Sequence, residues 1–221
     1  PDAYEQAPTA TTMVLSGVMV KMGLFAAIRW VLPLFPIATK TFAMPIVILS
    51  VIGMIYASLI AIKQDDIKRL IAYSSIAHIG LMAAAIFAGG TLGLQGVQVQ
   101  MFNHGINVIG LWILANAIES TLGTRKLSEL GGLATKAPTM AILFVVLAFA
   151  NIALPLTNAF IGEFLLFNGL FQYNIWIAAA AGVSIILGAI YTLQMVQKVL
   201  FGEVSAVTAN ATEINSYSKW V

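Results

Sequence analysis

Apolar residues come in six long runs along the chain, separated by short joints that carry charge, proline or glycine. A helix needs about 20 residues to cross the hydrocarbon core of a bilayer, and every run reaches about that length. The pattern therefore predicts an all-α polytopic membrane protein. Its six expected transmembrane helices cover residues 11–31, 43–62, 69–89, 94–118, 138–171 and 174–200.

The fifth run is too long for one straight helix. Its roughly 34 residues would rise about 50 Å, whereas the hydrocarbon core is about 30 Å thick. Pro155 lies near the middle of the run. Proline removes a backbone donor and disfavours helical geometry at the residue before it, here Leu154. We therefore expect a helix that is broken or strongly kinked at Pro155.

Composition supports a lipid environment. Hydrophobic residues make up 60% of the 221 residues and charged residues only 9%, against about 25% charged in an ordinary soluble domain. The net charge of +2 comes from basic residues in the joints, so no nucleic-acid surface is indicated. The chain has no cysteine, which excludes disulfides, thiolate metal sites and iron–sulfur ligation. No glycine-rich phosphate or dinucleotide motif is present.

The basic residues predict an orientation. The joints after the second, fourth and sixth runs share most of them: Lys63, Lys68, Arg69, Arg125, Lys126, Lys136 and Lys198. The opposite joints carry only Arg29 and Lys40. The positive-inside rule places the first set, and the segment before the first run, in the cytoplasm. Because the chain opens at Pro1 without a basic, signal-like segment, we expect an internal fragment or a processed piece.

Four ionisable residues lie inside the runs and not in the joints. Lys21, His78 and His104 each lie about nine or ten residues from the start of their run, roughly 13–15 Å deep, and Glu163 follows Pro155 in the broken run. A charge at the centre of a membrane helix costs about 2.5–3.5 kcal/mol on the lenient insertion scale. We therefore expect these groups to face one another, a polar partner or water.

Polar neighbours accompany these groups: Ser74, Asn103, Asn107 and Thr157. Ser74 precedes His78 by four residues, so the two side chains share a helix face. The two asparagines flank His104 at −1 and +3, and Thr157 lies at the expected break. These positions predict a polar seam across otherwise apolar helices.

We interpret the seam as a proton relay at mid-membrane depth, with histidines that exchange protons near neutral pH. Simpler interpretations stay open. Lys21 and Glu163 could form a structural ion pair, and each histidine could be a hydrogen-bonded packing residue. A metal site is disfavoured because the chain has only two histidines, neither with a ligand partner four residues on. Lys68 and Arg69 suggest an interfacial anchor, spaced to pair with Asp65 and Asp66.

Three segments resemble the antiporter-like membrane subunits of respiratory complex I (NADH–quinone oxidoreductase), the M-type subunit in particular. They are Pro1–Thr9 (PDAYEQAPT), Asp66–Ser75 (DIKRLIAYSS) with His78 and Gly80, and Ala153–Thr157 continuing to Phe160–Phe164 (ALPLT and FIGEF). The resemblance extends over residues 1–202. The break departs from the family's Leu-Pro-Gly-Thr-Gly pattern, because Leu156 and Asn158 replace the two glycines.

The resemblance implies a division into three parts. Residues 1–42 would hold a lead-in and the family's eighth helix, 43–201 a five-helix antiporter-like repeat, and 202–221 a polar tail. It also implies site roles. Lys21 would be a central-axis lysine, His78 and His104 relay residues, and Glu163 the terminal acid on the broken helix. Glutamate at that position is typical of the M-type subunit.

The expected function is proton translocation coupled to quinone reduction elsewhere in the complex. The resemblance implies that NADH, FMN, iron–sulfur clusters and quinone bind other subunits, with no cofactor or redox site in this chain. The expected partners are other complex I membrane subunits, the lipid bilayer and protons, with Na⁺ as the alternative ion. The expected location is the bacterial cytoplasmic (inner) membrane. The alternatives are an Mrp-type cation/proton antiporter subunit and a structural membrane scaffold.

Overall fold

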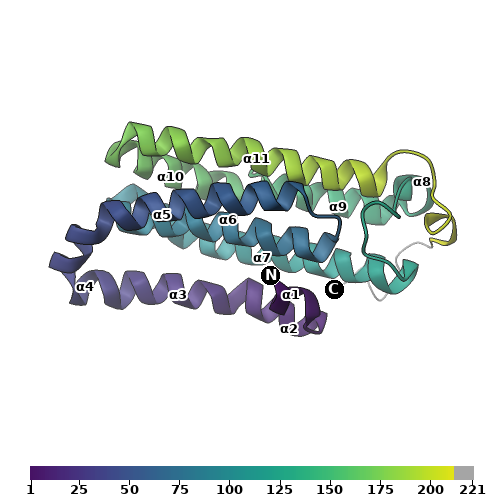
Figure 1. Ribbon diagram of the computed structural model, residues 1–221, viewed down its shortest axis with the longest axis horizontal. Coiled ribbons are helices and arrows are strands. Elements are labelled where there is room, and N and C mark those ends of the chain that lie inside the picture. Colours follow the sequence, from purple (N-terminus) through teal and green to yellow (C-terminus); the bar gives the residue numbers. More distant parts are fainter. Residues whose placement is uncertain (212–221) are drawn as a thin grey trace.

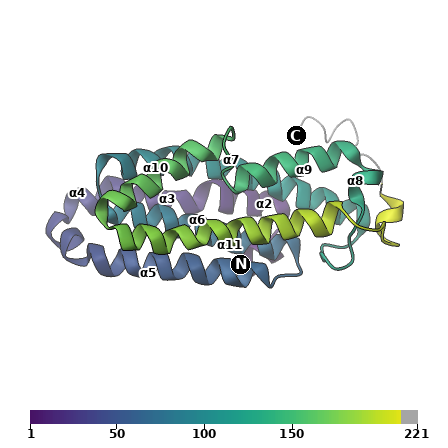
Figure 2. The same cartoon turned by 90° about the horizontal axis from the view of Figure 1, so that it is seen from above.

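The computed structural model describes residues 1–211, which form an elongated bundle of antiparallel helices (Figures 1 and 2). No β-strand occurs in this part of the chain. The α-helices are α1 (Asp2–Gln6), α2 (Thr9–Val14), α3 (Val20–Ala26), α4 (Leu32–Leu34), α5 (Pro36–Ile62), α6 (Ile67–Ala88), α7 (Thr91–Leu122), α8 (Leu133–Lys136), α9 (Pro138–Asn151), α10 (Asn158–Tyr173) and α11 (Ile175–Leu200). Two π-helical turns, η1 (Leu15–Met19) and η2 (Ala27–Val31), join α2 to α4, and a 3-10 turn, η3 (Thr208–Asn210), follows α11.

Five helical stretches within residues 1–211 are long and apolar enough to cross a bilayer: Thr9–Leu34, Pro36–Ile62, Ile67–Ala88, Thr91–Leu122 and Ile175–Leu200. The remaining crossing is shared by two shorter helices, α9 and α10, which follow each other along the bundle (Figure 2). The all-helical membrane fold and the broken fifth span are thus confirmed. Helix α5 begins before its predicted limit of 43 and ends at the predicted residue 62, and α7 extends beyond both of its predicted limits, 94 and 118.

Local signals in the joints set the helix limits. Asp66 caps α6 by accepting hydrogen bonds from the backbone N–H groups of Lys68 (2.8 Å) and Arg69 (3.1 Å). Between α6 and α7, Gly89 (φ +77°) and Gly90 (φ +82°) adopt positive φ angles that favour glycine. The chain therefore reverses direction there within two residues.

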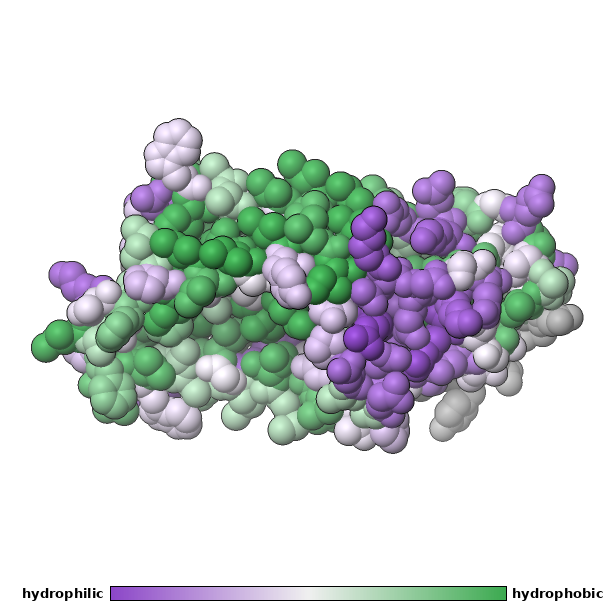
Figure 3. Space-filling view, viewed as in Figure 1, coloured by the Kyte–Doolittle hydropathy of each residue, from purple (hydrophilic) through white to green (hydrophobic). Residues whose placement is uncertain are grey.

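Apolar side chains cover most of the surface along the helices, and polar side chains gather toward one end of the bundle (Figure 3). Large exposed side chains on α5 include Leu49 and Ile52 (67% and 57% exposed). Such exposure is typical of a surface that faces lipid. The bundle is therefore an integral membrane structure with one strongly polar end. Residues 212–221 of the predicted tail lie outside the described residues.

Two apolar clusters fill the interior and leave a polar zone between them. On α6, Ile71 belongs to one cluster and Leu81 to the other, and His78 lies between these two residues in the chain. On α7, Val108 and Val97 enclose His104 in the same way. Apolar packing above and below therefore confines the predicted polar seam to the middle of the bundle.

Candidate functional site

Three of the four predicted ionisable residues meet inside the bundle. Nδ1 of His78, on α6, lies 3.2 Å from Oε1 of Glu163, on α10. The ring centroids of His78 and His104, on α7, are 4.8 Å apart and the rings are tilted by 45°. His104 is 3% exposed and Glu163 is 9% exposed, so the group is largely closed to the surroundings. Three helices thus bring titratable side chains into direct contact.

Gln100 completes what we call the central cluster: His78, Gln100, His104 and Glu163. Its Nε2 donates to Oε1 of Glu163 across 3.4 Å, so amide and imidazole converge on the same carboxylate oxygen. Nε2 of both histidines is buried and has no hydrogen-bond partner among residues 1–211. Buried polar atoms are normally satisfied by protein or ordered water. These two ring nitrogens are therefore candidate positions for bound water.

A small cavity adjoins the central cluster. It has a volume of about 30 Å³, and its lining includes His78, Glu163, Asn151 and Tyr191. A water molecule needs roughly 10–15 Å³ of such space and two to four polar partners. The cavity meets both conditions, so it can hold water beside the His78–Glu163 contact.

A second set of hydrogen bonds includes Asn151 and Tyr191, which also line this cavity. Nδ2 of Asn151 donates to Oγ of Ser74 (3.2 Å) and to Oγ1 of Thr192 (3.3 Å). The hydroxyl groups of Ser74 and Tyr191 are 3.0 Å apart. Ser74 therefore joins α6 to α9 and α11 instead of contacting His78 directly. The polar zone extends through the cavity into this hydroxyl and amide network.

Lys21 approaches the cluster from the first span. It is 7% exposed, and its Nζ donates to the backbone carbonyl of Ser16, which belongs to the π-helical turn η1. It also interacts electrostatically with His104. No carboxylate of residues 1–211 forms an ion pair with Lys21. The alternative of a structural Lys21–Glu163 ion pair is therefore wrong, because Glu163 pairs with His78.

Two glycines allow the first span to come this close. A Cβ on Gly105 of α7 would lie 2.9 Å from the backbone oxygen of Gly17. Real Cβ atoms are essentially never that close to another atom, so the backbones of η1 and α7 touch directly here. Gly17 precedes Lys21 by four residues on the same face, and Gly105 follows His104. Close backbone contact thus directs Lys21 toward the cluster.

The predicted asparagines hold the broken span in place. Nδ2 of Asn103 donates to the carbonyl of Asn158 (2.6 Å), and Nδ2 of Asn107 donates to the carbonyl of Ala150 (3.2 Å). These carbonyls lie at the start of α10 and the end of α9. Carbonyls in the last turn of a helix lack a partner within that helix, so Asn107 helps to satisfy the end of α9. The two asparagines therefore tie α7 to both halves of the broken span, and neither forms a side-chain hydrogen bond with His104.

The break itself is strained. Ala153 (φ +51°) and Leu156 (φ +78°) adopt positive φ angles, which non-glycine residues rarely do. Leu156 stands at one of the two positions where the resemblance seen in the sequence implies glycine. Thr157 donates to the carbonyl of Leu154 (2.7 Å) within the same loop. The structure therefore does not bring Thr157 into the central cluster, but it does break the span around Pro155.

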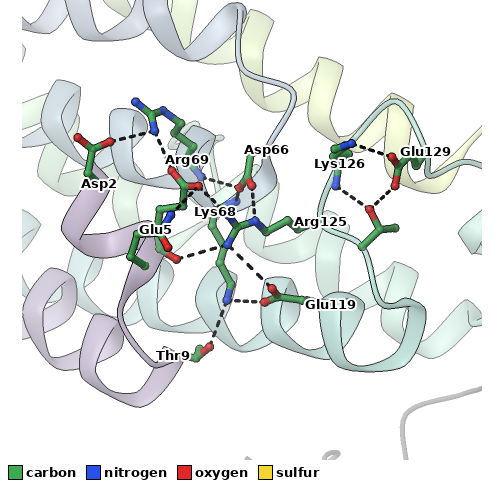
Figure 4. Close-up of polar contacts among 12 residues, drawn as sticks. Asp2, Glu5, Thr9, Asp66, Lys68, Arg69, Glu119, Arg125, Lys126 and Glu129 are labelled. Atoms are coloured by element: carbon green, nitrogen blue, oxygen red, sulfur yellow. Dashed lines mark hydrogen bonds and ion pairs between the residues drawn. The ribbon is translucent and has the colours of Figure 1, made fainter.

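A separate ion-pair network lies at the polar end (Figure 4). Glu5 of α1 joins Arg69 of α6 (2.8 Å) to Arg125 of the α7–α8 joint (2.6 Å). Lys68, which is only 6% exposed, pairs with Glu119 of α7 across 2.5 Å. Side chains from four separate segments thus tie the amino-terminal residues to the bundle.

The expected pairing of Asp65 and Asp66 with Lys68 and Arg69 is wrong. Asp66 lies outside the helix as its cap, where its carboxylate accepts from backbone N–H groups and also pairs with Arg125. Asp65 instead accepts hydrogen bonds from the backbone and hydroxyl of Ser128 (2.9 and 2.6 Å). Backbone donors at a helix start compete successfully with side-chain cations.

The pKa values of two titratable groups at the polar end, Tyr4 and Glu129, are shifted by their surroundings. Burial raises the pKa of the Tyr4 phenol, whose ring packs edge-on against Trp112. A hydrogen bond from Thr124 and the neighbouring charge of Lys126 lower the pKa of the Glu129 carboxyl. Both groups lie outside the membrane-spanning helices, so they belong to the polar end and not to the central cluster.

Sequence reasoning missed several members of the site. Gln100 precedes His104 by four residues, so the shared helix face could have indicated it. Asn151, Tyr191 and Thr192 come from other helices, and their spacing along the chain carries no such signal. Among residues 1–211, no group of three or more His, Asp or Glu side chains has the geometry of a metal site.

Comparison with known proteins assigns most of the chain to one protein family. The family described as NADH:quinone oxidoreductase/Mrp antiporter, TM, matches residues 1–188. NADH-quinone oxidoreductase subunit M of Rickettsia prowazekii is 42% identical over 205 residues, which are 93% of this chain and 42% of the relative.

Solved structures agree with this assignment. A chain of respiratory complex I from Thermus thermophilus with bound NADH superposes with a TM-score of 0.89 at 30% identity, covering 96% of this chain and 44% of that chain. The Mrp complex from Dietzia sp. DQ12-45-1b has a chain of the same fold, with a TM-score of 0.86 at 24% identity over 92% of this chain and 38% of that chain. The chain thus spans about two fifths of the length of these proteins.

Proposed function

Because this chain belongs to the NADH:quinone oxidoreductase/Mrp antiporter transmembrane family, we propose that it is the C-terminal half of a proton-translocating, antiporter-like subunit of an NADH–quinone oxidoreductase. One observation carries the proposal. His78, His104 and Glu163, from three different helices, are in contact in the middle of the bundle beside a cavity of water size. Ionisable residues inside a membrane typically belong to ion or proton pathways.

The central cluster is suited to pass one proton at a time. A proton can lie on the imidazole of His78 or on the carboxylate of Glu163, whose facing atoms are 3.2 Å apart. A positive charge on His104 disfavours a second positive charge on His78, because the two rings are neighbours. Arrival of a proton at His104 therefore favours release of the proton from His78 toward Glu163.

Lys21 would set the charge state of this relay. Its ammonium group has a backbone carbonyl as partner but no carboxylate within residues 1–211. An unneutralised cation near His104 opposes protonation of that ring, and loss of the charge favours it. A change of charge on Lys21 would thus move the proton equilibrium of the cluster without any redox chemistry in this chain.

The same proposal also assigns roles to the parts of the chain around the relay and to the other subunits of the complex. Residues 43–201 would form the five-helix antiporter-like repeat, with 1–42 as the preceding helix and lead-in and 202–221 as a tail. Other membrane subunits would be its partners. NADH, FMN, iron–sulfur clusters and quinone would bind elsewhere in the complex, and quinone reduction there would drive the charge changes. The bacterial cytoplasmic membrane would be its location.

Glu163→Gln tests this function in the full-length subunit assembled in its complex. The substitution keeps the size of the side chain and removes its ability to ionise. We expect proton pumping per NADH oxidised, measured in proteoliposomes, to fall severalfold while assembly is retained. Glu203→Gln is the matched control, because Glu203 lies after α11 at the polar end. Unchanged pumping by an assembled Glu163→Gln complex would overturn the proposed role.

An Mrp-type cation/proton antiporter subunit is the second candidate. It is supported by the family description, which names both groups, and by the shared fold of the Dietzia chain. Exchange of Na⁺ for H⁺ in vesicles that lack NADH and quinone would favour it. The relatives of higher identity named as NADH-quinone oxidoreductase subunit M favour the first candidate.

A further inference from the structure

An open groove lies between the ends of α5 and α11 at the polar end of the bundle. It has a volume of about 390 Å³ and is lined by Ile62, Lys63, Gln194, Gln197 and Lys198. Apart from Ile62, these lining side chains are exposed. We call it the lysine groove. No role in the proposed proton relay falls on any of these residues.

The two lysines of this groove, like Lys136, differ from the paired basic residues at the same end. Lys126 pairs with Glu129, and Lys68 and Arg125 both have carboxylate partners. Lys63 and Lys198 form no ion pair with any carboxylate of residues 1–211. The lining of the groove also contains no acidic residue. Two free positive charges and two amides therefore face one open space.

The helices that form the groove continue into an apolar, outward-facing surface. On α5, Tyr56 and Leu59 are 66% and 50% exposed, and on α11, Ile190 and Leu193 are 38% and 46% exposed. These residues lie one to two turns from Lys63 and Lys198 along helices that pack side by side. Apolar side chains thus lead directly into a basic, amide-lined recess.

We propose that the lysine groove binds the headgroup of an anionic phospholipid. The lysines would neutralise the phosphate, the glutamine amides would donate hydrogen bonds to its oxygens, and the acyl chains would lie along the apolar surface of α5 and α11. An acidic protein segment would match the charge equally well. It would not match the apolar surface that continues from the groove toward the centre of the bundle.

Helix-end effects alone do not account for this arrangement. Lysine near a helix C-terminus is favoured by the helix dipole, and its stem packs along apolar surface while its amine reaches polar surroundings. These effects act on each helix separately. They do not require that Lys63 and Lys198 share one recess with two glutamines and no carboxylate.

The test measures lipid binding by the full-length subunit in its purified complex. Delipidated complex is reconstituted in nanodiscs of phosphatidylcholine with increasing phosphatidylglycerol, and bound lipid is quantified by native mass spectrometry. The test variant is Lys63→Gln with Lys198→Gln. The matched control is Lys40→Gln with Lys136→Gln, which removes the same charge from sites outside the groove.

A lysine near an anionic surface contributes about fivefold to affinity, so two lysines contribute on the order of 25-fold. We expect the test variant to lose about tenfold or more in phosphatidylglycerol binding, with assembly and phosphatidylcholine binding unchanged. The control variant should bind as the parent protein does. An equal loss of phosphatidylglycerol binding in both variants would mean that general surface charge causes the effect, and it would overturn the proposed site. Unchanged binding in the test variant would overturn it as well.

Discussion

Nδ1 of His78 and Oε1 of Glu163 are 3.2 Å apart, and this contact joins α6 to the second half of the broken span. A buried ionised group is stable only when it is paired, and a pair of this kind can exist as two charges or as two neutral groups. The position of one proton decides between the two forms. The same contact therefore contributes to helix packing and to the proposed relay.

Removing either partner of this contact should destabilise the bundle. We expect His78→Leu to cost about 3 kcal/mol, because Glu163 then loses its imidazole partner inside the bundle. Adding Glu163→Leu should recover part of the loss, with a coupling energy of about 1–3 kcal/mol between the two positions. Unfolding midpoints of the two single variants and the double variant measure this coupling. Strict additivity would contradict a direct His78–Glu163 interaction.

The approach of the first span to α7 depends on glycine at position 105. Gly105→Ala places a Cβ against the backbone oxygen of Gly17, so the two helices must separate. Overpacking of this kind costs about 1–3 kcal/mol. We expect lower thermal stability together with reduced pumping, because Lys21 moves away from His104.

Gly53→Ala serves as the control for that substitution. Gly53 lies in α5, and a Cβ there would meet nothing within 4 Å. Alanine is the better helix former by up to about 1 kcal/mol. The control should therefore be neutral or slightly more stable, with normal pumping. A stable, active Gly105→Ala protein would mean that α7 and the first span tolerate a wider separation.

Glycine should relieve the strain at Leu156. The side chain is fully exposed and its φ is +78°, so its removal costs little packing and permits the positive φ. We expect Leu156→Gly to raise stability by up to about 1 kcal/mol. Leu154→Gly, at a position without positive φ, should lower it by a similar amount. Melting curves of the two variants provide the comparison, and the same sign in both would argue against strain at Leu156.

Glu5 should anchor the amino-terminal segment. Its carboxylate contacts both Arg69 and Arg125 and its side chain is only 11% exposed, so Glu5→Gln leaves Arg125 without a counter-charge from α1 and Arg69 with only the exposed Asp2. We expect a loss of about 1–2 kcal/mol and faster hydrogen exchange in residues 1–8. Asp2→Asn is the control, because Asp2 is 80% exposed and such surface pairs contribute little. Equal exchange rates in both variants would show that the network does not hold this segment.

Several parts of the site were accessible from the sequence because they depend on local order or on position along a helix. The interruption at Pro155 follows from proline chemistry and run length. The mid-span placement of Lys21, His78 and His104 follows from counting residues along helices of known rise. Gln100 shared a helix face with His104 and could have been added by the same argument.

Partners that come from different helices were not accessible in this way. Asn103 and Asn107 were expected beside His104, yet they donate to backbone carbonyls of the broken span. Asp66 was expected to pair with a nearby cation in its own helix, yet it caps that helix and contacts Arg125. In each case the outcome depends on which unsatisfied backbone or charged group another segment brings within reach.

By itself, the sequence determined a helical membrane bundle, its broken span and the position of its ionisable groups along the helices, because the bilayer imposes helix length and penalises isolated charge. Only the tertiary structure decided which of these groups touch. Rotation of each helix about its axis, and close contacts such as Gly17 against Gly105, place Glu163 against His78 and leave Lys21 with a carbonyl partner. Those rotations result from packing among all the helices together, which no single run of residues encodes.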